Sequence, residues 1–203
     1  MASDLKKSPI AIRFDHLLNV ISSQRFLRME GIGKEVPFFV VPYCPTEHLE
    51  IEAIRGQLIN KLRHKGIRVL EINLYVLSKE LMDVEGDWQH WIDNEATTSK
   101  VDLLEALQNL TDAETKLAPA IASKISESEF DVLFLSGVGE VFPYIRSHTV
   151  LNNLQSVAKS HPMVMFFPGD YSHSLEDGAS LDLFGRLHDD KYYRAFNIFE
   201  RET

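Results

Sequence analysis

Two apolar segments of this sequence run directly into a glycine, and this pattern constrains the fold more than any other feature. Val132–Leu135 is followed by Ser136-Gly137, and Met163–Phe167 is followed by Pro168-Gly169. Short, continuous apolar runs are typical of strands buried on both faces of a parallel sheet. Open α/β sheets place their ligand sites in the loops at the carboxyl ends of such strands. We therefore predict a candidate site in the loops after the third and fourth strands.

Alternating helical and strand patterns fill the rest of the chain. Further strands are predicted at 36–41, 67–72 and 195–199, and helices at 14–21, 25–28, 46–65 and 140–154. Residues 168–180 are predicted as a loop and 181–187 as a short helix. Gly66 suits the left-handed position after a helix end, and Ser99 suits an N-cap. Thr111 begins a capping-box pattern, and Pro119 should kink or restart the helix that follows.

These elements predict one α/β domain over residues 1–203. The expected architecture is a three-layer, Rossmann-like or P-loop-like fold with a mostly parallel sheet of about five strands. The helical stretch at about 74–127 is too long for a plain crossover, so we expect a helical insertion there.

Composition and charge restrict the class of protein. With 44% hydrophobic and 25% charged residues, the chain has enough apolar side chains for a sizeable core. A single cysteine, Cys44, excludes an internal disulfide, and we expect it to be a small buried apolar group. No apolar run approaches the ~20 residues that span a bilayer, and the amino terminus shows no secretory signal. We therefore expect a cytoplasmic protein without a membrane partner.

The usual catalytic motifs are missing from the sequence. It contains no G-x-x-x-x-G-K-[ST] or G-x-G-x-x-G loop, no G-x-S-x-G elbow, and no H-x₃-H or C-x₂-C pair. The turn at Gly137 to Gly139 could present N–H groups to an anion, but Glu140 would repel a phosphate there. The glycines equally suit a tight turn from a strand. We predict no catalytic residue, no metal and no cofactor, which favours a protein that is not an enzyme.

A segment near the carboxyl terminus interleaves basic and aromatic residues. It contains Arg186, Lys191, Tyr192, Tyr193 and Arg194. This composition is typical of nucleic-acid surfaces and of protein contact surfaces. The formal net charge of −9 disfavours global attraction to DNA, so direct DNA binding is possible but not favoured.

Several long strings in the sequence resemble one known family, the BrxB proteins. They are Arg25-Phe-Leu, Glu30-Gly-Ile-Gly-Lys-Glu-Val-Pro-Phe-Phe39, and the segments Leu135–Leu154, Phe166–Tyr171, Leu183–Leu187 and Tyr192–Phe196. BrxB is a core component of BREX, a bacterial system that restricts bacteriophage while methylating host DNA. The resemblance implies a defence-system accessory protein whose partners are other BREX proteins, with the PglZ protein first among them.

The resemblance carries motif positions but no catalytic residue set. The candidate ligand or partner surface consists of Gly137, Gly139, Arg146, His148, Asn153, Gly169, Asp170 and Tyr171. Arg146, His148 and Asn153 would form either a ligand site or a buried hydrogen-bond network near the carboxyl edge of the sheet. The leading hypothesis is a non-catalytic assembly or regulatory subunit acting by protein contact. The alternatives are a nucleotide-binding switch or enzyme that uses the loops after the third and fourth strands, and a DNA-contacting module.

Overall fold

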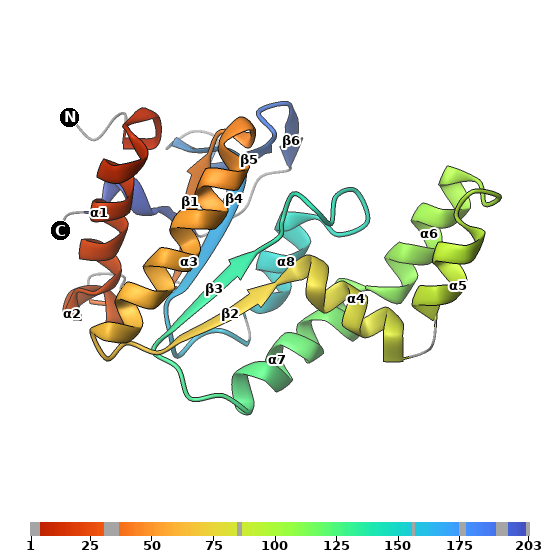
Figure 1. Cartoon of the computed structure of the whole chain (residues 1–203), viewed down its shortest axis with the longest axis horizontal. Coiled ribbons are helices and arrows are strands. Elements are labelled where there is room, and N and C mark those ends of the chain that lie inside the picture. The colour runs from red at the N-terminus through yellow and green to blue at the C-terminus, as the bar shows by residue number, and fades with distance from the viewer. Residues whose placement is uncertain are drawn as a thin grey trace.

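A parallel β-sheet forms the centre of the molecule (Figure 1). The computed structural model describes residues 5–30, 37–84, 87–155, 157–174, 178–189 and 195–201. Five strands lie parallel in the order β2-β3-β4-β1-β7. Their bounds are Phe38–Tyr43 (β1), Val69–Asn73 (β2), Val132–Ser136 (β3), Met163–Ser174 (β4) and Ala195–Asn197 (β7). The predicted mostly parallel sheet of an α/β fold is confirmed.

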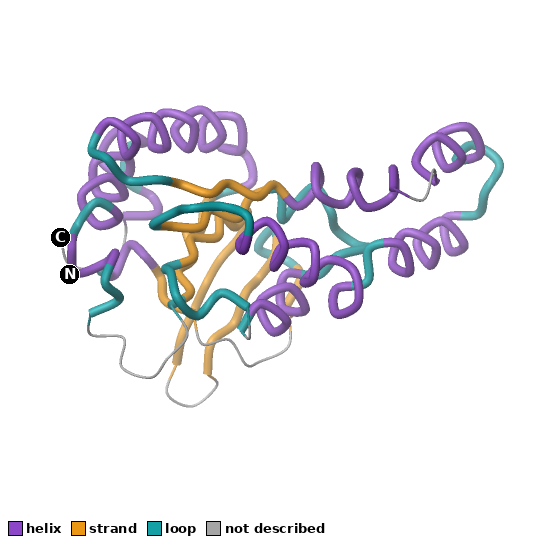
Figure 2. The backbone as a smooth tube through the Cα atoms, turned by 90° about the horizontal axis from the view of Figure 1, so that it is seen from below, coloured by secondary structure: helices purple, strands orange, loops and turns teal. Residues whose placement is uncertain are grey.

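Helices cover both faces of this sheet (Figure 2). Helices α1 (Ile10–Ile21), α2 (Gln24–Leu27) and α3 (His48–His64) pack on one face. Helices α4 (Leu74–Val84), α7 (Ala118–Ser126) and α8 (Ser147–Leu154) pack on the other. The remaining helical elements are α5 (Asp87–Asn94), α6 (Lys100–Leu110), the π-helix η3 (Ala113–Leu117), and the 3-10 turns η1 (Leu5–Lys7), η2 (Pro45–Glu47) and η4 (Ile198–Glu200).

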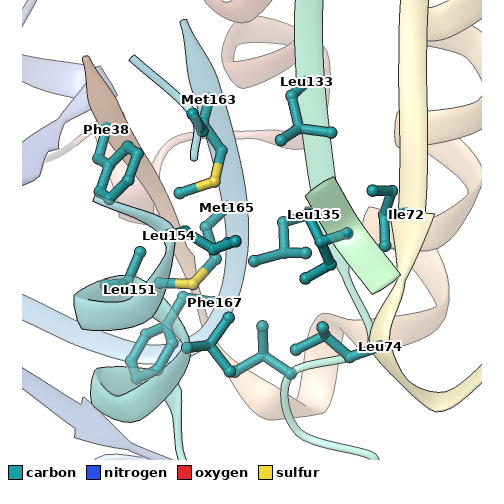
Figure 3. Close-up of a cluster of buried hydrophobic side chains, with 14 of the residues drawn as sticks. Phe38, Ile72, Leu74, Leu133, Leu135, Leu151, Leu154, Met163, Met165 and Phe167 are labelled. Carbon is teal, nitrogen blue, oxygen red and sulfur yellow. The ribbon is translucent and has the colours of Figure 1, made fainter. Parts of the chain in front are cut away.

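Alternate residues of each strand enter two separate hydrophobic cores. Figure 3 shows Met163, Met165 and Phe167 of β4 between β3 and the side chains of Leu151 and Leu154 in α8. The intervening residues, Val164 and Phe166, face the opposite core, which includes residues of α1 and α3. Because both faces are buried, the strands read as continuous apolar runs.

Local helix signals are confirmed at three of the predicted positions. Gly66 has a φ of +80° directly after α3, where a side chain would be strained. The Ser99 hydroxyl accepts the N–H of Asp102 at 3.2 Å and caps α6. Pro119 lies in the first turn of α7, so the helix restarts there. The capping box predicted at Thr111 is wrong, because Asp112 is the cap of the next helix.

Three predictions in the carboxyl-terminal half are wrong. The helix expected from 140 begins only at Ser147, after a run of turns that contains Pro143, a residue that helix interiors exclude. Within the described residues, 168–174 and 178–180 form strands where a loop was predicted, and 181–187 is not the predicted helix. Strand β4 instead continues to Ser174, and β5 (Gly178–Leu183) and β6 (Leu187–Asp189) add an antiparallel extension.

β5 can pair closely with β4 because β4 carries a glycine, Gly169, at the start of the paired segment. A Cβ atom on Gly169 would lie 2.2 Å from the carbonyl oxygen of Asp182. Glycine therefore acts here as a position of close backbone approach inside a strand, not as a turn residue.

Candidate functional site

A hollow of about 250 Å³ lies at the carboxyl ends of β1 and β3, beside Pro168 in the middle of β4. The chain leaves β1 toward α3 on one face of the sheet, and it leaves β3 toward α8 on the other. This divergence is the topological position at which open α/β sheets bind ligands. The lining comprises Tyr43, Pro45, His48, Gly137, Val138, Gly139, Glu140, Pro168 and Phe184. A concavity therefore lies beside the glycine turn after β3, one of the two segments in which a site was predicted.

Tyr43 and His48 form the polar pair on the β1 side of the hollow. The Tyr43 hydroxyl and Nδ1 of His48 form a hydrogen bond of 3.1 Å, and the two rings are stacked. Tyr43 is only 3% exposed, and burial raises its pKa to about 12. The phenol is therefore a neutral hydrogen-bonding group across the physiological range.

In the native protein, Tyr43 should ionise near pH 12. Because the pKa of Tyr43 is higher in the fold than in the unfolded chain, its contribution to stability is complete below about pH 10 and is lost as pH rises toward the folded value. An alkaline absorbance titration of the wild type against Tyr43→Phe measures this. A difference curve centred near pH 10 would contradict it.

Gly137 and Gly139, both predicted site residues, shape the opposite wall. Gly137 has a φ of +75°, and a Cβ there would lie 2.6 Å from Oδ1 of Asn73. That oxygen is already engaged, because it accepts the N–H of Val76 in the first turn of α4. A Cβ on Gly139 would lie 2.8 Å from Cγ of Pro168 and 3.1 Å from the ring of Phe184. Both glycines therefore permit close packing around the hollow.

Glu140 supplies the carboxylate of the hollow. It is exposed, and its backbone N–H closes a turn on the carbonyl of Gly137 at 3.1 Å. Within the described ranges of the chain, no lysine or arginine side chain forms an ion pair with it, and none lines the hollow. A cationic group entering from outside would meet an uncompensated negative charge.

Arg146 and Asn153 lie elsewhere, at a second hollow of about 290 Å³ between α8 and the α6–η3 segment. Arg146 is the exposed N-cap residue of α8, and Asn153 donates its amide N–H to the carbonyl of Thr149 at 2.8 Å. His148 is in the first turn of α8 and lines neither hollow. The structure therefore separates these residues from the glycine-lined hollow.

Gly169, Asp170 and Tyr171 are strand residues of β4 with structural contacts. Lys6 donates to the carbonyl of Gly169 at 2.8 Å and pairs with the Asp170 carboxylate. The Tyr171 hydroxyl donates to the carbonyl of Ala195, which ties β4 to β7.

The basic and aromatic segment is described only in part. Arg186 is exposed in the turn between β5 and β6. Lys191, Tyr192, Tyr193 and Arg194 lie outside the described residues. Their role as a contact surface stays a prediction.

The three rings of the hollow, those of Tyr43, His48 and Phe184, were not among the predicted site residues. Tyr43 is the last residue of β1 and His48 begins the helix after it, so the strand-end rule applied to that strand would have found them. Phe184 comes from the β5–β6 turn, which the sequence reading assigned to a helix. Cys44, expected to be buried, is exposed beside these residues, and hydrogen bonds with Thr46 lower its thiol pKa.

The residues that the structure describes form neither a metal-binding cluster nor a membrane-spanning helix. Among the residues that the structure describes, no group of three or more His, Cys, Asp or Glu side chains is arranged to hold a metal ion. No helix in the described parts of the chain is both long and apolar enough to cross a bilayer.

Comparison with known proteins places the sequence in one family. The family model described as "BREX protein BrxB" matches residues 70–198. A BREX protein BrxB of Bacillus cereus (strain H3081.97) is 34% identical over 193 residues, covering 93% of this chain and 97% of the relative. A second, from Escherichia coli O9:H4 (strain HS), is 27% identical over 188 residues, covering 92% and 90%. No solved structure matches the chain significantly. By its matched length and by these identities, the chain belongs to the BrxB family of BREX proteins.

Proposed function

We propose that the chain is a non-catalytic assembly or regulatory subunit of a BREX phage-defence system. It acts by contact with other BREX proteins, and the PglZ protein is the first candidate partner. Membership of the BrxB family supports a role in a BREX system, and the residues that line the hollow support action by protein contact.

The lining of the hollow is the observation that carries this proposal. It combines the rings of His48 and Phe184 with the carboxylate of Glu140, and the buried Tyr43 holds His48 by a hydrogen bond. Rings attract a cation over their faces, and a carboxylate pairs with it directly. An arginine or lysine side chain also has an apolar stem that suits apolar walls. The hollow therefore suits a cationic anchor residue of a protein partner.

The same lining disfavours the nucleotide-binding alternative. Glu140 repels phosphate, since like charges at close range in a partly buried site interact unfavourably. Helix α8 begins at Ser147, well after β3 ends at Ser136, so its N-terminal N–H groups do not directly follow the glycine turn. A phosphate site needs a lining without a carboxylate, and a helix whose first N–H groups directly follow the glycine turn.

Replacing Glu140 by lysine should weaken binding to the partner about tenfold, because the cationic anchor would meet a like charge. Affinity is measured by titration of purified PglZ protein, and then of each other BREX protein, into the wild type and the variant. Asp15→Lys is the matched control, since it makes the same charge change at an exposed position on α1.

Two outcomes separate the parts of this proposal. If no BREX protein binds the wild type at micromolar concentration, the assembly function is wrong. If a partner binds both proteins equally, the function stands but the hollow is not the contact. A thermal shift with ATP, GTP or their diphosphates would favour the alternative, because a ligand at 100 times its Kd stabilises by about 2.7 kcal/mol.

A further inference from the structure

Helices α5 and α6 form an arm that extends away from the sheet. Figures 1 and 2 both show the two helices side by side at the far end of the molecule from the termini. The arm, defined here as residues 87–110, lies between α4, which follows β2, and the π-helix η3. It contributes no side chain to either fully buried core.

The apolar side chains of this arm are only partly covered. Helix α6 has no fully buried residue, although Leu103, Leu107 and Leu110 recur at helical spacing. An amphipathic helix normally buries such a stripe against a neighbour. Ile92 on α5 is 49% exposed, and Val101 on α6 is 73% exposed. The arm thus keeps apolar surface available for a partner.

The exposed charged residues of the arm itself are mostly acidic. Asp93, Glu95, Asp102 and Glu105 are all exposed, against one lysine of the arm, Lys100. Two copies of the arm packed together would bring like charges close to one another, which is unfavourable. The same charge repels nucleic-acid phosphates. Self-association and DNA binding are therefore both disfavoured at this surface.

We infer that the arm binds a basic amphipathic helix of a partner protein, a conclusion that rests on the proposed assembly function. Apolar side chains of that helix cover the exposed side chains of Ile92 and Val101, as in other cases where a protein surface recognises an amphipathic helix. Lysine or arginine side chains flanking the apolar stripe pair with the carboxylates of the arm. The arm and such a helix would complement each other in apolar character and in the sign of their charges.

The tryptophans of the chain give a selective readout of this surface. The sequence has two, Trp88 and Trp91, and both lie in α5. A tryptophan-free synthetic peptide of about 18 residues, with leucine and lysine at amphipathic helical spacing, is titrated while their fluorescence is recorded. We expect a saturable change. A peptide with glutamate for lysine, and one with glutamine for leucine, should each produce none.

The double variant Ile92→Lys/Val101→Lys should bind the leucine–lysine peptide at least about tenfold more weakly. Both positions are exposed, so the fold should survive, and circular dichroism verifies this. Leu49→Lys is the matched control: Leu49 is 81% exposed at the start of α3, outside the arm, and its substitution should leave the affinity unchanged.

Several results would overturn the inference. One is that the leucine–lysine peptide causes no fluorescence change. Another is that the double variant binds this peptide as tightly as the wild type does. A third is that the wild type sediments as a dimer and the double variant as a monomer. The test is separable from that of the proposed function, because Glu140→Lys should bind the peptide normally. If BREX proteins bind the wild type and the double variant equally, the arm is not the contact while the assembly role stands.

Discussion

Replacing Glu47 by alanine is expected to lower the free energy of unfolding by about 3 kcal/mol. Its partner Arg13 is 2% exposed, and the Glu47 carboxylate accepts two of its N–H groups at 3.0 and 2.6 Å. The pair joins α1 to the η2 turn, next to Pro45 and His48 of the hollow. Removing the carboxylate leaves a buried guanidinium without its counter-charge, which costs far more than a surface ion pair contributes.

Urea unfolding at pH 7 and at pH 3 measures this effect and its pH dependence. The hydrogen bonds from Arg13 lower the pKa of Glu47. A carboxyl whose pKa is lowered by folding contributes its full stabilisation above its ordinary value of about 4.3 and loses it as pH falls through the folded value. The gap between wild type and Glu47→Ala should therefore narrow below about pH 4.

The double variant Arg13→Met/Glu47→Leu is the control for buried charge. With both charges removed and apolar atoms in their place, much of the lost stability should return. If Glu47→Ala alone costs less than about 1 kcal/mol, the pair behaves as a surface ion pair, and the argument from the burial of Arg13 fails.

The sequence-based prediction succeeded where the signal is local. Gly66 and Ser99 specify helix ends through their own backbone and hydroxyl, whatever surrounds them. The strands β3 and β4 are recognisable because both faces are buried and each run is continuously apolar. For the same reason Gly137 and Gly139 could be placed at the carboxyl end of β3, since they follow a recognisable strand; their role in a functional site stays a prediction.

It failed where the structure depends on which strands are neighbours. Pro42 and Pro168 both lie inside strands, although each was taken as a boundary. The pairing of β1 with β7 ends at Val40, so at Pro42 only β4 is a neighbour of β1. Beside Pro168, β4 has passed the end of its pairing with β3 at Met165. A missing N–H is tolerated at such one-sided positions, but no local sequence pattern shows where a neighbour ends.

The site prediction inherited this error. Because residues 168–187 were read as a loop and a helix, Phe184 could not be placed against Gly139 and Pro168. Arg146, His148 and Asn153 were predicted to lie together near the carboxyl edge of the sheet. The long turn segment that precedes α8 instead moves Arg146 and Asn153 to the η3 side.

Replacing Gly169 by alanine should cost about 3 kcal/mol, the upper range for overpacking. The new Cβ would lie 2.2 Å from the carbonyl oxygen of Asp182 and 2.7 Å from the ring of Phe167. That carbonyl cannot easily move, because it accepts the N–H of Gly185 at 3.0 Å. Strand β5 must therefore shift away from β4, and thermal and urea unfolding measure the loss.

Gly56→Ala is the matched control, because nothing lies within 4 Å of a Cβ at this exposed position in α3. There alanine should stabilise the protein by about 1 kcal/mol through its better helix propensity. The same methyl group thus has opposite effects at the two glycines.

Displacing β5 also displaces Phe184, whose N–H is held by the carbonyl of Pro168 at 2.8 Å. Gly169→Ala should consequently weaken partner binding at the hollow while leaving peptide binding to the arm intact. Equal stability of Gly169→Ala and wild type would show that the hairpin adjusts freely, and Phe184 would then not be a fixed wall of the hollow.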